Sequence, residues 1–143
     1  MAGRNDPFGA FNFLVEIDGV TKATFSEVTG LSVEIVAIDY REGGDPTTVR
    51  KLPGLTKYTN IVLKRGYTAD RSLWNWMQSV LNGQVVRASM TVTLLDAGRQ
   101  PVLQWTVKEA WPCKYQGPIL RAEGNDVAIE TIEICHEGIE LAQ

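Results

Sequence analysis

The sequence predicts a mainly β protein: an antiparallel β-barrel or sandwich of about seven strands, with one packed α-helix and one long extended loop. Several segments alternate apolar and polar residues or carry β-branched runs, which is typical of half-buried strands. A single helical segment interrupts the strands, and this order disfavours a doubly wound α/β fold. Because 143 residues is the length of one ordinary domain, we expect residues 1–143 to form a single domain.

Turn signals separate the predicted strands. Asp18-Gly19 is a hairpin turn, and the short polar run DAGRQ at 96–100 is another, so the strands on either side of each turn should pair antiparallel. The predicted strands cover 11–17, 20–28, 31–40, 58–65, 87–95, 101–108 and 126–136.

Two of these strands are irregular. In 31–40 the apolar positions change from odd to even numbers between Ile35 and Val36, and in 126–136 they change after Ile129. Such a switch implies a β-bulge or a strand that is covered on both faces. We expect either where a sheet curls or meets another subunit.

The predicted helix covers about 70–82. Asp70 can cap its start and Gly83 follows its end. Trp74 falls off the apolar stripe, so it lies either at the edge of the core or free for a partner. The stripe that should face the sheet comprises Leu73, Trp76, Met77, Val80 and Leu81.

The polar segment 41–57 is too long for a simple connection inside a small domain, and such loops are usually functional. Residues 41–65 carry six cationic side chains and two acidic ones, whereas 122–143 carry six acidic side chains and no cationic one. Complementary patches on one chain favour head-to-tail self-association. Pairing within the chain, or simple solubility, explains the same asymmetry equally well at this point.

The sequence offers little for catalysis. His136 precedes Glu137, and the two could form a proton-transfer pair in a hydrolase. A single histidine with no second ligand or nucleophile motif completes neither a triad nor a metal site, so a surface or interface histidine is the favoured interpretation. We therefore predict no catalytic residue and no enzyme.

Cofactor and metal motifs are also missing from the sequence. Neither GxxxxGK[ST] nor GxGxxG occurs, EGND lacks the spacing of an EF-hand loop, and Cys113 and Cys135 have no zinc-site spacing. We expect two reduced, core-filling cysteines, no cofactor and no bound metal.

Bulk properties restrict the class of protein further. A net charge of −3 argues against a general nucleic-acid binder. The first residues hold no secretory signal, and nowhere do 18 apolar residues follow one another. We therefore expect synthesis in the cytoplasm and no direct membrane insertion.

Taken together and in order, seven motifs resemble the tail tube proteins of contractile phages, and above all the inner-tube subunits of phage-tail-like contractile injection systems. The motifs are DPFGAFNFLVEIDG, FSEVTGL, IDYREGG, VRKLPGLTKYTNIVLKRG, SLWNWM, LLDAGRQPVLQWTVKEAWPCKYQGP and AEGNDVAIETIEICHEG. The resemblance implies a barrel-like subunit that forms hexameric rings, which stack into a rigid hollow tube around a lumen. It further implies that the tube is not an enzyme.

The resemblance also implies partners and a location. These are the subunit itself, a contractile sheath, baseplate or hub proteins, a tube terminator and a possible luminal cargo, in a particle that is assembled in the bacterial cytoplasm and can be released. It leaves open whether that particle is a phage tail or an injection system. The alternative from another class is a soluble small-ligand or effector-binding β-barrel that builds no tube.

In the family, the long loop reaches towards neighbouring subunits. We therefore expect contacts between subunits from this loop and from the acidic strand near the C-terminus. The candidates are Arg41, Glu42, Arg50, Lys51, Leu52, Pro53, Leu55, Lys57, Tyr58, Glu130 and Glu133.

Overall fold

The computed structural model describes residues 12–41, 43–44, 47–120, 122 and 128–142, and it is mainly β with one helix, as predicted. The described residues form ten strands in place of the seven expected, because segment 20–28 divides into two strands, most of a further strand lies in the predicted loop, and a short strand follows the last predicted one. The elements are β1 (Phe13–Ile17), β2 (Thr21–Phe25), β3 (Glu27–Thr29), β4 (Val33–Tyr40), β5 (Arg50–Tyr58), β6 (Ile61–Gly66), α1 (Ser72–Leu81), β7 (Ala88–Leu95), β8 (Pro101–Gln116), β9 (Ile129–Cys135) and β10 (Gly138–Leu141).

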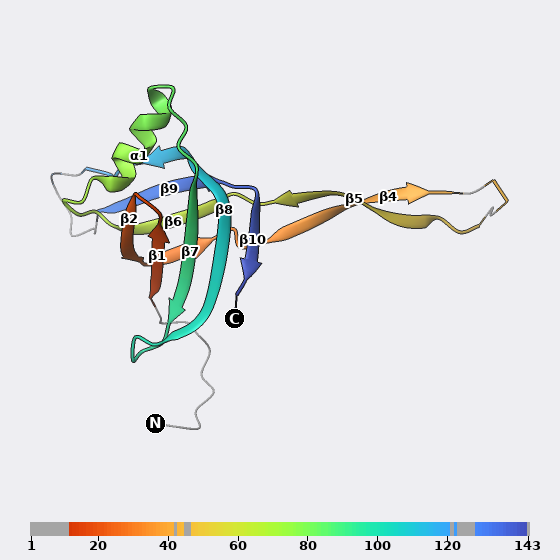
Figure 1. Ribbon diagram of the computed structural model, residues 1–143, viewed down its shortest axis with the longest axis horizontal. Helices are drawn as coiled ribbons and strands as arrows, with labels where there is room; N and C mark the ends of the chain where they lie inside the picture. The colour runs from red at the N-terminus through yellow and green to blue at the C-terminus, as the bar shows by residue number, and fades with distance from the viewer. Residues whose placement is uncertain (1–11, 42, 45–46, 121, 123–127, 143) are drawn as a thin grey trace.

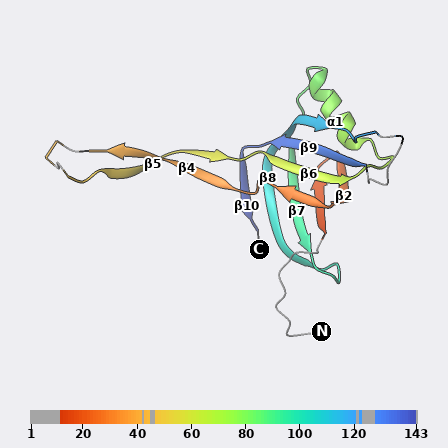
Figure 2. The same ribbon diagram turned by 180° about the vertical axis from the view of Figure 1, so that it is seen from behind.

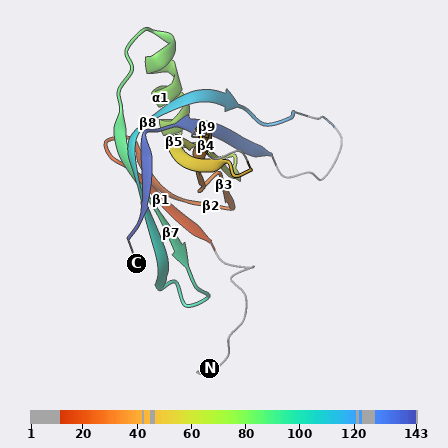
Figure 3. The ribbon, with the colours of Figure 1, turned by 90° about the vertical axis from the view of Figure 1, so that its right-hand side faces the viewer.

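Eight strands form one antiparallel sheet in the order β2-β1-β7-β8-β9-β6-β3, and β10 pairs with β8. Strand β8 is 16 residues long and serves both halves of the sheet: Trp105 to Lys108 pair with β10, and Trp111 to Gln116 pair with β9. Between these two stretches, Glu109 has a φ of 53°, a conformation that is uncommon for a residue other than glycine. In Figure 3, β1, β7 and β10 run steeply down the picture, whereas β9 and the end of β8 run across it.

The core lies inside this bent sheet, and α1 lies beside β8 (Figure 1). The hairpin predicted at Asp18-Gly19 forms, and the strands around 96–100 pair antiparallel. Side chains from the strands and the helix share one apolar cluster. Its buried members are Val15, Ile17, Phe25, Ile61, Leu63, Leu73, Trp76, Ala88, Met90, Val92, Val107, Ala110, Ile132 and Ile134.

The helix differs from its prediction in two details. Asp70 does not occupy the N-cap position, which Arg71 holds, but its carboxylate accepts a hydrogen bond from the Ser72 N–H at 3.0 Å. Leu81 is 63 % exposed, because the stripe leaves the sheet in the last turn. Gly83, with a φ of 86°, follows the helix end as predicted.

Strands β4 and β5 form a separate two-stranded ribbon that projects from the rest of the molecule (Figures 1 and 2). We call this ribbon the arm, and the eight-stranded sheet with α1 the body. The predicted loop over 41–57 is therefore wrong for 50–57, which belong to β5. A ribbon that packs on no core needs no apolar alternation, so the pattern typical of a half-buried strand is missing from β5.

The two irregular strands have different explanations. The register of β4 against β5 shifts between Ile35 and Ala37, which confirms the bulge expected there. Strand β9 pairs with β6 without interruption, and the shift lies on β8 between Pro112 and Lys114. The parity change after Ile129 arises because that residue is 45 % exposed while an acidic residue takes the next inward position.

Candidate inter-subunit surface

The arm exposes apolar side chains that the described part of the chain leaves uncovered. Single exposed apolar residues are common in soluble proteins, but several of them gathered on one ribbon indicate a surface that binds a protein. A two-stranded ribbon is also marginally stable in water when nothing packs on it. The exposed fractions are Val33 54 %, Ile35 55 %, Ile38 51 %, Tyr40 45 %, Val49 50 %, Leu52 45 % and Leu55 76 %.

The middle of the arm is shaped by Pro53 and Gly54. Pro53 lies opposite Ala37, and proline is tolerated there because both strands of a ribbon are edge strands. A Cβ on Gly54 would lie 2.7 Å from the Val36 carbonyl oxygen and 2.9 Å from two carbons of Ile38. Only glycine therefore allows the two strands to approach at the bulge.

The described residues of the arm carry more cationic than acidic side chains. Lys51 pairs with Asp39 at 2.9 Å, with both side chains about two-thirds exposed, and Lys57 lies opposite Glu34. Arg50 and Arg41 are exposed at the outer end of the ribbon. Pairs this exposed contribute little to the stability of the chain.

The arm continues the ladder that β3 and β6 form in the body. At the junction, the Ser32 hydroxyl donates to Thr59 Oγ1 at 2.8 Å. Gly30 has a φ of 93°, and a Cβ there would lie 2.0 Å from the Asn60 carbonyl oxygen. The Asn60 side-chain amide donates to Glu133 at 2.9 Å, which ties the junction to β9.

Of the eleven predicted contact residues, seven lie on or next to the arm and are exposed or half-buried: Arg41, Arg50, Lys51, Leu52, Pro53, Leu55 and Lys57. Tyr58 is half-buried at the base of the arm, and Glu133 is half-buried on β9. Glu42 lies outside the described residues. Glu130 is the exception, because it is buried inside the body.

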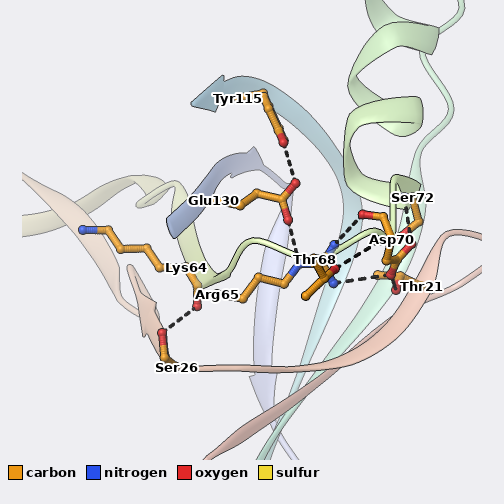
Figure 4. A network of polar contacts seen from close by, with 9 residues as sticks. All are labelled: Thr21, Ser26, Lys64, Arg65, Thr68, Asp70, Ser72, Tyr115 and Glu130. Atoms are coloured by element: carbon orange, nitrogen blue, oxygen red, sulfur yellow. Dashed lines mark hydrogen bonds and ion pairs between the residues drawn. The ribbon is translucent and has the colours of Figure 1, made fainter. Parts of the chain in front are cut away.

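Glu130 is paired within its own chain. Arg65 Nε donates to the Glu130 carboxylate at 2.7 Å, with side-chain exposures of 5 % and 2 % (Figure 4). The Tyr115 hydroxyl donates to the other carboxylate oxygen. Burial raises the pKa of Tyr115, and its hydrogen bond to Glu130 raises that pKa further. The expectation that Glu130 contacts a neighbour is therefore wrong, since its carboxylate is fully engaged inside the subunit.

The same buried arginine reaches the start of the helix. Arg65 Nη1 lies 3.5 Å from an Asp70 carboxylate oxygen (Figure 4). Hydrogen bonds from Ser72 are the main cause of the lowered pKa of Asp70, and the charge of Arg65 adds to them. This network joins β6, β8, β9 and α1. Part of the charge asymmetry seen in the sequence is therefore pairing within the chain.

The surface beside the helix has a shallow aromatic depression. Its volume is about 320 Å³, and it is lined in part by Tyr67, Trp74 and Tyr115. The Trp74 and Tyr115 rings meet edge to face, with centroids 5.3 Å apart. This depression is open at the surface, whereas the core inside the sheet contains large, fully buried side chains such as Phe25 and Met90.

The predicted alternatives that depend on chemistry find no support in the geometry. Both ring nitrogens of His136 contact backbone groups, and Glu137 instead lies 4.0 Å from Arg87, so the His–Glu pair does not form. Cys113 and Cys135 are free and half-buried, and burial raises the pKa of the Cys113 thiol to about 12.

Within the described residues, no group of three or more side chains could hold a metal ion. Across those same residues, no helix is long and apolar enough to cross a membrane.

Sequence reasoning missed the apolar half of this surface. The predicted contact residues do not include Val33, Ile35, Ile38 and Tyr40, although all four are about half exposed. The parity switch between Ile35 and Val36 was the available signal, because it placed apolar side chains on both faces of one strand.

Several solved structures share this fold. The chain is 28 % identical to a chain of the PVC sheath-tube complex, an extracellular contractile injection system in its extended state. That match has a TM-score of 0.82 and covers 94 % of this chain and 90 % of the other. The anti-feeding prophage tube-terminating cap matches at 22 % identity and a TM-score of 0.82, over 99 % of this chain and 94 % of that one. Hcp1 from Flavobacterium johnsoniae matches at 16 % identity and a TM-score of 0.58, over 92 % and 95 % of the two chains.

No functionally curated protein sequence matches the chain significantly. The model of the T4-like virus tail tube protein gp19 family, however, matches residues 9–140, which is nearly the whole length. The chain shares its fold with a chain of the PVC sheath-tube complex and with the anti-feeding prophage cap. The chain belongs to the T4-like virus tail tube protein gp19 family.

Proposed function

We propose that this chain is a structural, non-catalytic subunit of the inner tube of a contractile phage tail or injection machine. It assembles into hexameric rings, and the rings stack into a hollow tube that serves as a conduit. The observation that carries this proposal is the arm, a projecting ribbon with seven exposed apolar side chains on it or directly next to it, in a member of a tail tube family.

Burial against a neighbouring subunit explains why such an arm can persist. Contact with a neighbour removes apolar side chains such as Leu55 and Ile38 from water, at roughly 25 cal/mol per Å² of apolar surface. A contact between two different patches is heterologous, so it generates rings or continuing stacks. The arm is therefore the part of the subunit that converts separate domains into a stiff assembly.

The outward face of the body is suited to line a conduit. On β7 and β8, the positions that alternate with the buried Met90, Val92 and Val107 carry polar side chains, which include hydroxyls, an amide and the Lys108 ammonium, and Gln104 donates to Thr93 at 3.4 Å. Thr91 lies opposite Thr106 in the same ladder. We assign this polar face to the lumen, because one wet face and one packed face are typical of an antiparallel sheet next to water.

The matched structures include a sheath-tube complex, a baseplate and a tube-terminating cap. By analogy, the partners of this subunit are a sheath that contracts around the tube, baseplate or hub proteins and a terminator, with cargo in the lumen. The subunit is made and assembled in the bacterial cytoplasm and becomes part of a phage tail or a tail-like particle that can be released.

Electron microscopy of the purified full chain tests this proposal. We expect rings or tubes with sixfold symmetry, alone or when baseplate components are supplied to nucleate them. A matched variant should replace residues 34–57 with a two-residue Asn-Gly turn, which keeps the body and removes the arm. We expect this variant to fold and to remain monomeric. Monomers alone for the natural chain, with baseplate components present, would overturn the proposal.

A further inference from the structure

His136 lies on the turn between β9 and β10, beside Thr59, the first residue after the arm. Its Nδ1 accepts a hydrogen bond from the Gly138 N–H at 3.2 Å, and its Nε2 lies 2.8 Å from the Thr59 carbonyl oxygen. Because Nδ1 acts as an acceptor, the ring proton is on Nε2 and is donated to Thr59. Only the neutral imidazole makes both bonds at once.

The imidazole also packs on the last residue of the arm. The ring centroids of Tyr58 and His136 are 5.6 Å apart, with an angle of 55° between the planes. A Cβ on Gly138 would lie 3.7 Å from the Tyr58 ring, so the aromatic side chain also lies close to the β9–β10 turn. The base of the arm therefore rests on this turn.

The turn itself is part of the rigid body. The Glu137 N–H donates to the Lys108 carbonyl oxygen at 3.0 Å, and β10 pairs with β8 from Gly138 onwards. By contrast, the hydrogen bond between Ser32 and Thr59 joins the segment that enters the arm to the segment that leaves it, and does not reach the body. Besides the backbone, the ties from the described junction to the body include the Asn60–Glu133 bond, a longer contact of 3.8 Å between the Asn60 amide and Cys113 Sγ, and the contacts of His136.

We propose that His136 is a positioning residue that sets the direction in which the arm leaves the body. Its ring links two segments that are far apart in the sequence: Tyr58-Thr59 at the base of the arm, and the β9–β10 turn through the Gly138 N–H. Direction matters because the arm is a lever. Its eight-residue strand β4 spans roughly 26 Å, so a rotation of about 10° at the base moves the tip by about 5 Å.

We call the contacts of His136 with Tyr58, Thr59 and Gly138 the clamp, and they lie within one chain. The idea that the direction of the arm controls assembly rests on the proposed function. The two parts can therefore be measured separately. Arm direction is measured on the dilute full chain as the distance between two spin labels, one at position 48 next to the arm and one at position 97 on the body. The labels are attached to azide-bearing unnatural residues, so that both cysteines stay native. Assembly is measured as tube yield at a fixed protein concentration.

Two variants distinguish the hydrogen bonds of His136 from the packing of its ring on Tyr58. His136→Phe keeps an aromatic ring beside Tyr58 and loses both hydrogen bonds, while His136→Gln retains a donor and an acceptor. We expect His136→Phe to broaden the distance distribution and to lower tube yield about tenfold, the change expected for one to two lost hydrogen bonds. His136→Gln should restore part of both. The control Glu137→Gln alters the adjacent exposed side chain and should change neither.

A His136→Phe chain with the distance distribution of the natural chain would overturn the proposal, whatever its tube yield. A thermal unfolding midpoint that falls equally in His136→Phe and His136→Gln, with no rescue of the distances by Gln, would also overturn it in favour of a purely structural role. If the natural chain forms no tubes, the proposed function fails, while the distance measurement still decides the clamp.

Discussion

The arm and the body are both antiparallel β structure, yet they are stabilised in opposite ways. The body buries its apolar side chains against its own strands, and Val15, Leu63 and Ile132 are completely inaccessible to water. In the arm, Leu55 is 76 % exposed and Ile35 is 55 % exposed. The body therefore carries its own apolar core, whereas the arm has the composition of half of an interface.

Charged groups show the same contrast. In the body, Arg65 and Glu130 pair out of reach of water, where loss of one partner leaves an uncompensated charge. In the arm, Lys51 and Asp39 pair in solvent, where water and salt weaken the attraction. Substitutions in the body should therefore change folding, and substitutions in the arm should change assembly.

The largest expected effect is on the body. Glu130→Ala should lower the free energy of unfolding by about 3–5 kcal/mol, because it leaves the Arg65 guanidinium buried without its partner. Urea unfolding followed by circular dichroism measures this. The control Glu140→Ala breaks an exposed pair with Lys108 and should cost far less, because water and salt screen that attraction. Equal costs for the two variants would contradict the contrast between buried and exposed pairs.

The next prediction concerns the apolar side chains of the arm. Leu52→Ser combined with Leu55→Ser should abolish tubes in electron micrographs, because the surface that a neighbour would cover becomes polar. The free energy of unfolding of the monomer should stay within about 0.5 kcal/mol per substitution. As a control, Leu120→Ser changes a residue that is 86 % exposed but lies off the arm, and it should leave tube yield intact. Normal tubes in the double variant would contradict the assignment of the arm to an interface between subunits.

A smaller effect is expected from the cations of the arm. Arg50→Glu combined with Lys51→Glu should weaken assembly by about 0.2–1 kcal/mol per contact, and repetition along the tube makes the sum measurable. Light scattering at increasing salt should show the difference from the natural chain shrinking as charges are screened. Lys22→Glu, on the exposed face of β2, is the matched charge reversal off the arm. Tube yield identical to that of the natural chain would rule out a role for the two cations.

The smallest effect is a pH dependence at the start of the helix. The pKa of Asp70 is lowered in the folded chain, first by hydrogen bonds from Ser72. A lowered folded pKa gives a contribution to stability that is complete above the unfolded pKa, near 3.9, and is lost as the pH falls through the folded value. Asp70→Asn should therefore lose stability at neutral pH, and its deficit should shrink below roughly pH 4. Parallel pH profiles of urea midpoints for the two chains would contradict this.

Much of the body was predictable because local rules determine it. The periods of the strands and of the helix, the turn at Asp18-Gly19 and the ending at Gly83 each depend on a few neighbouring residues. The free cysteines and the bulge near Ile35 were readable in the same way. The arm was only half predictable, because the strand Arg50–Tyr58 packs on no core and has none of the alternation that such packing produces.

The sequence by itself determined the class of fold, the position of the helix, the acidic and basic halves and, through ordered motifs, the resemblance to tail tube proteins. Only the tertiary structure decided which charged side chains form ion pairs inside the subunit. Arg65 and Glu130 are 65 positions apart in the chain, and the pairing of β6 with β9 brings them within 2.7 Å. The same folding places His136 beside Thr59, because strand pairing, and not distance along the chain, determines which side chains meet.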